Sequence, residues 1–193
     1  AELPRDLMPK GRLEMALNGS ELADFINKIQ KEVSGADISI TTFANEVTGL
    51  NKRVTMRDVL NTYRYPNTLS VLKISGRELK RAINKNYEYI VMEKGQEQIN
   101  PDYIYPKLQH YNFDFFYGIE YELDFTKDFQ DRLISLSKDG ETIEDDDYLS
   151  IVMNNYRTTG VSGFDMYKDL EELKVINIEV SQLIVDYLIE NYK

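Results

Sequence analysis

The chain has 193 residues, of which 42% are hydrophobic and 29% charged, and this predicts a globular protein with a substantial core. Its formal net charge of −10 argues against a nucleic-acid partner, because a phosphate backbone calls for clustered Lys and Arg. No apolar run approaches the length of about 18 residues that a membrane-spanning helix needs, so no membrane partner is expected.

Two residue counts narrow the chemistry further. Cysteine is absent, which excludes disulfides, thiolate catalysis and Cys-based zinc sites. His110 is the only histidine, whereas phosphoesterase sites that hold two metals use several. The sequence also lacks the Gly-x-Ser-x-Gly elbow that would suggest a serine relay through His110. We therefore interpret His110 as a structural or surface residue and predict no metal site in this chain.

The first half of the chain alternates predicted helices and strands. Residues 1–14 read as an irregular lead-in with two prolines, and residues 15–193 as the folded domain. Ser20 is a typical N-cap, and the apolar spacing after it is helical. In chain order, the predicted elements are a helix over 20–34, a strand over 37–43, a short helix over 55–60, a strand over 68–74 and a helix over 76–90.

Strands dominate the second half. A polar stretch with two prolines, 96–109, is predicted to be a loop, and Gly118 is a candidate bulge in the strand that follows. The acidic run 144–147 is typical of a solvated turn, and its spacing does not follow that of a calcium-binding EF-hand. The remaining predictions are strands over 116–124, 132–136, 148–154 and 173–178, a hairpin turn over 138–141 and a closing helix over 181–192. This mixture favours an α+β fold with a mixed sheet over a doubly wound one.

Two aromatic segments, 63–69 and 154–164, each adjoin an apolar strand pattern. Together they suggest a clamp that holds a flat polar ring between Tyr65 and Phe164, since aromatic side chains stack on any nucleobase. Asp169 offers a carboxylate for ribose hydroxyls. The alternative is that both segments are surface turns with packed tyrosines.

Several short strings carry a resemblance that covers roughly residues 15–190. In chain order they are ADISITTFAN at 36–45, VTMRDV at 54–59, YPNTL at 65–69, LKISG at 72–76, YNFD at 111–114, GIEY at 118–121 and NNYR at 154–157. In combination they resemble the C-terminal domain of the bacterial 5′-nucleotidases. YPNTL and NNYR resemble in particular the branch of 2′,3′-cyclic-nucleotide 2′-phosphodiesterases/3′-nucleotidases.

The resemblance implies a division of labour between two domains. An N-terminal metallophosphoesterase domain, with two divalent metal ions, would hydrolyse the phosphate ester, and the C-terminal domain would bind the nucleoside part and deliver it. This chain would then be the C-terminal domain alone, inactive by itself and without a cofactor. Its partners would be a nucleotide or nucleoside and the N-terminal domain, and its location extracellular, periplasmic or at the cell surface.

Two alternatives stay open at this point. Instead of the C-terminal domain of a nucleotidase, the chain would be a stand-alone nucleoside-binding domain without a catalytic partner, or a protein-interaction domain that kept the fold and lost the pocket.

The resemblance also assigns roles to single residues. Tyr65 and Phe164 resemble the two rings of the base sandwich, and Asp169 matches the ribose-binding acid. Asn45 resembles the asparagine of the catalytic site that meets the phosphate at the domain interface. Arg12 falls where an arginine near ribose and phosphate is expected.

Two further polar residues and two departures complete the comparison. Asn112 and Asp114 either line the same cleft or cap the incoming strand. The glycine-rich nucleotidase loop that ends in arginine is replaced by NEVTGL at 45–50, which lacks the arginine. The loop before Phe164 reads TTGVSG at 158–163, and its shape is expected to differ from that of the family.

Overall fold

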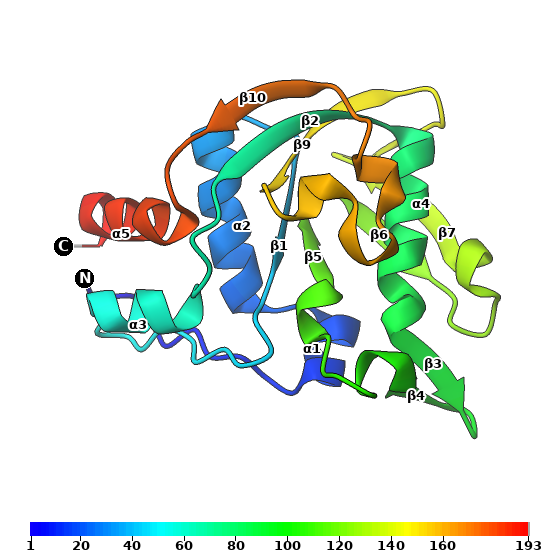
Figure 1. Cartoon of the computed structure of the whole chain (residues 1–193), viewed down its shortest axis with the longest axis horizontal. Coiled ribbons are helices and arrows are strands. Elements are labelled where there is room, and N and C mark those ends of the chain that lie inside the picture. The colour runs from blue at the N-terminus through cyan, green and yellow to red at the C-terminus, as the bar shows by residue number, and fades with distance from the viewer. Residues whose placement is uncertain (193) are drawn as a thin grey trace.

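A five-stranded mixed sheet forms the centre of the computed structural model, which describes residues 1–192 (Figure 1). The strands lie in the order β10–β2–β9–β1–β5. Their bounds are Ile38–Thr42 for β1, Leu69–Ser75 for β2, Asp114–Tyr117 for β5, Tyr148–Asn154 for β9 and Glu172–Ile176 for β10. β1 and β9 run parallel, and the other neighbouring strands run antiparallel. The prediction of an α+β fold with a mixed sheet is therefore confirmed.

The helices α2, α3 and α4 begin at residues whose side chains cap them. Ser20 accepts a hydrogen bond from the backbone N–H of Ala23, and Thr55 forms a capping box with Asp58. The α-helices are α1 (Arg12–Asn18), α2 (Glu21–Ser34), α3 (Met56–Thr62), α4 (Gly76–Asn86) and α5 (Val180–Asn191). Single 3₁₀ turns are η1 (Tyr87–Tyr89), η2 (Pro101–Tyr103), η3 (His110–Asn112), η4 (Phe129–Asp131), η5 (Arg157–Thr159), η6 (Val161–Gly163) and η7 (Asp165–Tyr167).

Both faces of the central sheet are covered. Successive side chains of a strand point to opposite faces, yet Ile38, Ser39, Ile40 and Thr41 of β1 are all buried. Figure 1 shows α2 and α5 to one side of β1 and α4 to the other. The centre of the sheet is therefore buried, and its free surface is at its edges and strand ends.

Two small sheets flank the central one. β3 (Ile90–Glu93) pairs with β4 (Gln96–Ile99), and β7 (Leu133–Lys138) lies between β6 (Glu120–Leu123) and β8 (Glu141–Thr142). The prediction of a loop over 96–109 is wrong at its start, because β4 is a strand. The strand is polar and mostly exposed, so no apolar alternation marks it in the sequence.

Gly118 separates two strands that the sequence predicted as one. Its φ of 94° favours glycine, and a Cβ atom there would lie 2.6 Å from the carbonyl oxygen of Asp37. The chain therefore leaves the central sheet after β5 and enters another sheet at β6. The predicted continuous strand over 116–124 is corrected to two strands in different sheets.

The lead-in packs along the body of the domain. Leu3 is buried, and isolated bridges join Glu2 to Arg53 and Leu7 to Leu50. No helix within residues 1–192 is long and apolar enough to cross a membrane.

Candidate functional site

Four loops meet at one edge of the central sheet, and the strand directions explain why. β1 and β9 are parallel, so both end at this edge, at Thr42 and Asn154. β2 and β5 are antiparallel to them and begin there, with Leu69 opposite Asn154 and Asp114 opposite Thr42. The loops after β1 and β9 and before β2 and β5 therefore come together. The carboxyl ends of parallel strands are a common place for ligand sites.

These loops enclose a cavity of about 300 Å³. Tyr65 and Tyr156 line it with rings that are 47% and 48% exposed, so both are accessible from solvent. The complete lining is Thr42, Tyr65, Asn67, Lys107, Tyr111, Asn154 and Tyr156. The set combines three rings, two amides, a hydroxyl and one ammonium group, which suits a flat, polar, anionic or neutral ligand.

The segment around Tyr111 is held against the end of β1. The Thr42 hydroxyl is within hydrogen-bond distance of the carbonyl oxygens of Tyr111 and Phe113, at 2.8 and 2.7 Å. Asn45 uses both ends of its amide on the same segment. It donates to the carbonyl oxygen of Leu108 at 2.9 Å and accepts from the backbone N–H of His110 at 3.0 Å. Asn45 thus fixes the loop that carries Lys107.

A buried ion pair lies beneath this edge. Arg157 and Asp114 are each almost fully buried, and Nη2 of Arg157 lies 2.8 Å from Oδ1 of Asp114. Nη2 also donates to the carbonyl oxygen of Tyr111 at 3.3 Å, and Oδ1 of Asn154 accepts from the backbone N–H of Arg157 at 2.8 Å. Burial raises the pKa of Asp114, and the charge of Arg157 and its hydrogen bond partly offset that effect.

Phe164 does not line the cavity, contrary to the expectation that its ring is half of a clamp. Its side chain is 1% exposed, and the guanidinium carbon of Arg157 lies 4.3 Å from its ring centroid. The ring of Tyr167 is parallel to it at a centroid distance of 5.8 Å. In this structure Phe164 therefore packs under the loop, and Tyr156 supplies the second accessible ring.

Lys107 is the one basic side chain in the cavity lining. Its Nζ lies 5.8 Å from the ring centroid of Tyr111. None of the ion pairs within residues 1–192 includes Lys107, and no carboxylate lines the cavity. The cavity of this acidic protein is therefore locally positive.

Tyr63 lies next to two amides that line the cavity, those of Asn67 and Asn154. It is buried, and desolvation raises the pKa of its hydroxyl to about 12, an effect that the nearby amides of Asn67 and Asn154 reduce. The hydroxyl therefore stays neutral and polar next to the two amides that line the cavity.

Arg12 stands at the start of α1 and acts on the backbone beyond β1. Its Nη2 donates to the carbonyl oxygens of Ala44 and Asn45, at 2.5 and 2.7 Å. Burial lowers the pKa of Arg12, whose guanidinium lies near Tyr89. Arg12 thus positions Asn45 and does not line the cavity.

The last two candidate residues also lie outside the cavity lining. Asn112 is buried and donates to Oε1 of Gln109 at 3.1 Å, so it supports the loop from inside. Asp169 is exposed on the segment that follows η7. Neither side chain lines the cavity in this structure.

Residues 1–192 bring together no group of three or more His, Asp or Glu side chains that could hold a metal ion. The donor set for the two metals implied by the resemblance is therefore not found in the described part of the chain, and no chemical step of this domain is assigned to a metal.

Sequence reasoning missed several residues of the cavity. The sequence carried a signal for Tyr156, because it follows the end of β9 by two positions and stands in the NNYR string. It carried none for Lys107 and Tyr111, since they belong to a long irregular loop whose path depends on contacts with Asn45 and Thr42.

These features define a class of protein. It is an α+β domain with a mixed sheet and with a polar aromatic cavity at the ends of two parallel strands. A family model described as the 5′-nucleotidase C-terminal domain matches residues 10–169. The match covers most of the chain, and the chain belongs to this family.

Curated relatives agree with this assignment. The chain is 29% identical over 154 residues to the trifunctional nucleotide phosphoesterase protein YfkN of Bacillus subtilis, a match that covers 70% of this chain and 10% of that protein. It is 28% identical over 179 residues to a Haemophilus influenzae 2′,3′-cyclic-nucleotide 2′-phosphodiesterase/3′-nucleotidase, covering 80% of this chain and 26% of that protein. The chain thus spans only a small part of these relatives.

Solved structures show the same fold. A Staphylococcus aureus protein provisionally named a 5′-nucleotidase, crystallised with alpha-ketoglutarate, is 32% identical with a TM-score of 0.95. The match covers 99% of this chain and 38% of that one. The NAD nucleotidase of Haemophilus influenzae shares the fold with a TM-score of 0.75 at 19% identity, over 98% of this chain and 35% of that one.

Proposed function

We propose that this domain binds the nucleoside part of a nucleotide and positions its phosphate for hydrolysis by a metal-dependent N-terminal domain. The observation that carries the proposal is the cavity at the ends of β1 and β9, where Tyr65 and Tyr156 offer accessible rings beside two amides and Lys107. The names of the curated relatives, which are nucleotide phosphoesterases, support it. A TM-score of 0.95 to a longer chain named as a nucleotidase supports the two-domain arrangement.

The chemistry of the lining explains how a nucleoside would be held. Any of the nucleobases can stack on an aromatic ring. Alanine substitution of such a ring typically reduces the binding free energy by about 1–3 kcal/mol per stacked base. The amides of Asn67 and Asn154 offer donors and acceptors to the edge of the base or to ribose hydroxyls. Lys107 supplies a positive charge for the phosphate, while the loop over 45–50 lacks the family arginine.

The other candidate residues take supporting roles in this proposal. Asn45 and Arg12 fix the loops beside the cavity, and Asp114 acts through Arg157. We propose Tyr156 in place of Phe164 as the second stacking ring, because only Tyr156 is accessible in this structure. Asp169 does not line the cavity in this structure, and its contact with a ribose stays a prediction.

A location outside the cytoplasm is part of the same proposal. A neighbour in fold from Thermus thermophilus, 19% identical with a TM-score of 0.74 over 98% of this chain and 36% of that one, is named a 5′-nucleotidase precursor. The term fits a protein that is processed after synthesis.

A titration with adenosine tests the function, with calorimetry or NMR as the readout. We expect a dissociation constant of about 1 mM or lower, and we expect Tyr65→Ala and Tyr156→Ala each to weaken binding by about tenfold. Tyr148→Ala is the matched control, because Tyr148 is 66% exposed on β9 and does not line the cavity. Equal affinity of the wild type and both cavity variants would remove the proposed stacking site.

A further inference from the structure

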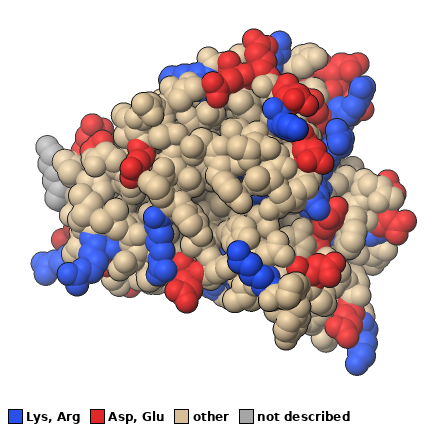
Figure 2. All heavy atoms as spheres, viewed as in Figure 1, with Lys and Arg blue, Asp and Glu red and all other residues tan. Residues whose placement is uncertain are grey.

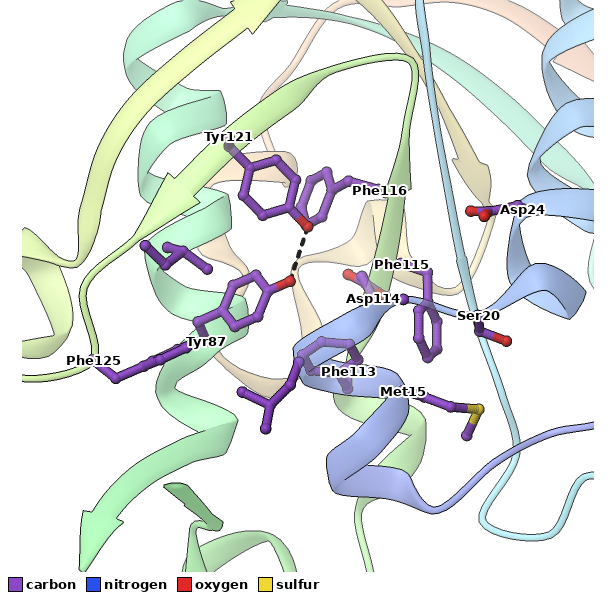
Figure 3. Close-up of a pocket in the computed structure, with 13 residues that line it drawn as sticks. Met15, Ser20, Asp24, Tyr87, Phe113, Asp114, Phe115, Phe116, Tyr121 and Phe125 are labelled. Carbon is purple, nitrogen blue, oxygen red and sulfur yellow. Dashed lines mark hydrogen bonds between the residues drawn. The ribbon is translucent and has the colours of Figure 1, made fainter. Parts of the chain in front are cut away.

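The cavity at the ends of β1 and β9, lined by Tyr65 and Tyr156, is called the nucleoside cavity below. A second, separate cavity lies between α1, the start of α2, β5 and β6 (Figure 3). Its volume is about 330 Å³, and it shares no lining residue with the nucleoside cavity. Six aromatic side chains line it: Tyr87, Phe113, Phe115, Phe116, Tyr121 and Phe125.

Contacts between the rings hold them in place. The ring of Tyr87 meets those of Phe113, Tyr121 and Phe125 at centroid distances of 5.4, 5.9 and 5.9 Å. The ring of Tyr121 also meets that of Phe116 at 6.1 Å. The aromatic wall is therefore preorganised and does not have to be assembled by a ligand.

The polar groups of the cavity favour a hydrogen-bond donor. The hydroxyls of Tyr87 and Tyr121 lie 2.9 Å apart, as the dashed line in Figure 3 shows. Desolvation raises the pKa of both groups, so both hydroxyls stay neutral. One hydroxyl donates to the other, so the pair keeps one O–H and several oxygen lone pairs, and the lone pairs can accept from a ligand.

Charge in the cavity is negative and unbalanced. Two carboxylates belong to the lining, Asp24 and Asp114, and no Lys or Arg does. Asp114 is paired with Arg157. None of the ion pairs found in residues 1–192 includes Asp24, whose side chain is exposed at the mouth. Desolvation and the nearby Glu21 raise the pKa of Asp24, as expected of a carboxylate without a cation.

We propose that this cavity binds a small organic ammonium ion, with its apolar body against the aromatic wall and its charge between Asp24 and the Tyr87–Tyr121 hydroxyl pair. The faces of aromatic rings attract cations, and a carboxylate at the rim adds a charge-assisted contact. The same features disfavour anions, so this site and the nucleoside cavity select ligands of opposite charge.

A series of three ligands that differ in charge tests the proposal on the wild-type chain. Benzylammonium, benzyl alcohol and benzoate are titrated separately, and the methyl signal of Met15, which lines this cavity, is followed by NMR. We expect saturable shifts with the ammonium ion at a dissociation constant near 1 mM, and binding weaker by about tenfold or more for the other two. Absence of a saturable shift at about 10 mM, or equal affinity for the alcohol, would overturn the proposal.

A pair of variants on one helix separates the role of Asp24 from that of net charge. Asp24→Asn is expected to weaken binding of benzylammonium by about tenfold, which is the factor for 1.4 kcal/mol. Glu32→Gln changes the net charge equally, lies on α2 outside this cavity and should leave the affinity unchanged. Tyr65→Ala should also leave the Met15 titration unchanged, because Tyr65 belongs to the other cavity. Equal effects of Asp24→Asn and Glu32→Gln would contradict a specific site.

Discussion

Arg157 joins more parts of the candidate site than any other residue described above. Its side chain pairs with Asp114 on β5, contacts the carbonyl oxygen of Tyr111 and covers the ring of Phe164. The cavity next to it depends on the positions of Tyr111 and Asn154. A buried arginine therefore links the fold to the candidate site, although it does not line the cavity.

Removal of the carboxylate partner should be costly. Asp114→Ala leaves the charge of Arg157 buried and unpaired, and such a change typically lowers the free energy of unfolding by about 3–5 kcal/mol. Urea unfolding measures the loss. The double variant Asp114→Ala/Arg157→Met should lose less than the sum of the two single variants, since it removes both charges. A loss below about 1 kcal/mol for Asp114→Ala would place the pair in a solvated setting instead.

His110 is the second residue whose chemistry bears on the site. Its Nδ1 lies 2.5 Å from the hydroxyl oxygen of Tyr89, and its backbone N–H donates to Asn45. Desolvation lowers the pKa of His110, and the charge of Arg12 lowers it further. The histidine is therefore more easily protonated in the unfolded chain than in the folded one.

The sign of the pH effect follows from that difference. Because the unfolded state binds more protons, the stabilising contribution of neutral His110 is present above pH about 6.5 and is lost as the pH falls toward its lower folded pKa. His110→Gln should flatten this part of the stability profile. As the chain has a single histidine, NMR titration of the imidazole reports its pKa directly. A measured pKa at or above about 6.5 would contradict the account.

Elements with strong local sequence signals were predictable, and strands that depend on pairing with another strand were not. The prediction for β9 matches the structure over 148–154, and α2 begins directly after its predicted cap at Ser20. β4 was missed because an exposed polar strand exists only through its pairing with β3. The break at Gly118 was predicted as a bulge, since a sequence does not show which sheet receives the next strand.

α5 offers a direct test of the helical pattern that was predicted over 181–192. Leu188 is 3% exposed, whereas its neighbour Ile189 is 61% exposed. Leu188→Ala should lower the free energy of unfolding by about 2–5 kcal/mol through lost burial and a cavity. Ile189→Ala, one position along the same helix, should change it by about 0.5 kcal/mol or less. Similar losses for the two variants in chemical melts would contradict the orientation of the helix.

The whole molecule brings residues far apart in the sequence to one edge of a sheet. Figure 1 shows the loop after β9 and the segment around η3 near the centre of the visible face. Figure 2 shows that the charged side chains of this face lie mostly toward its margins. Sequence patterns identified the family. In this structure Tyr65 lines the cavity, whereas the ring of Phe164 is buried against Arg157 and Tyr167, and no sequence pattern shows those two contacts.

We expect that the chain alone does not hydrolyse phosphate esters. The described residues do not gather the ligands that two catalytic metals need, and we propose that another domain supplies them. Incubation with 2′,3′-cyclic AMP and Mn²⁺ should give no turnover above a blank. Turnover that copurifies with the chain and disappears in the Lys107→Ala or Asn45→Ala variant would contradict this division of labour.

The central claim is that the cavity at the ends of β1 and β9 holds a nucleoside between Tyr65 and Tyr156. A crystal structure of the chain with adenosine tests it most directly. The account predicts electron density for the base between these two rings, with Phe164 still buried under Arg157. Density for the base between Tyr65 and an exposed Phe164, or at any other place on the molecule, would contradict it.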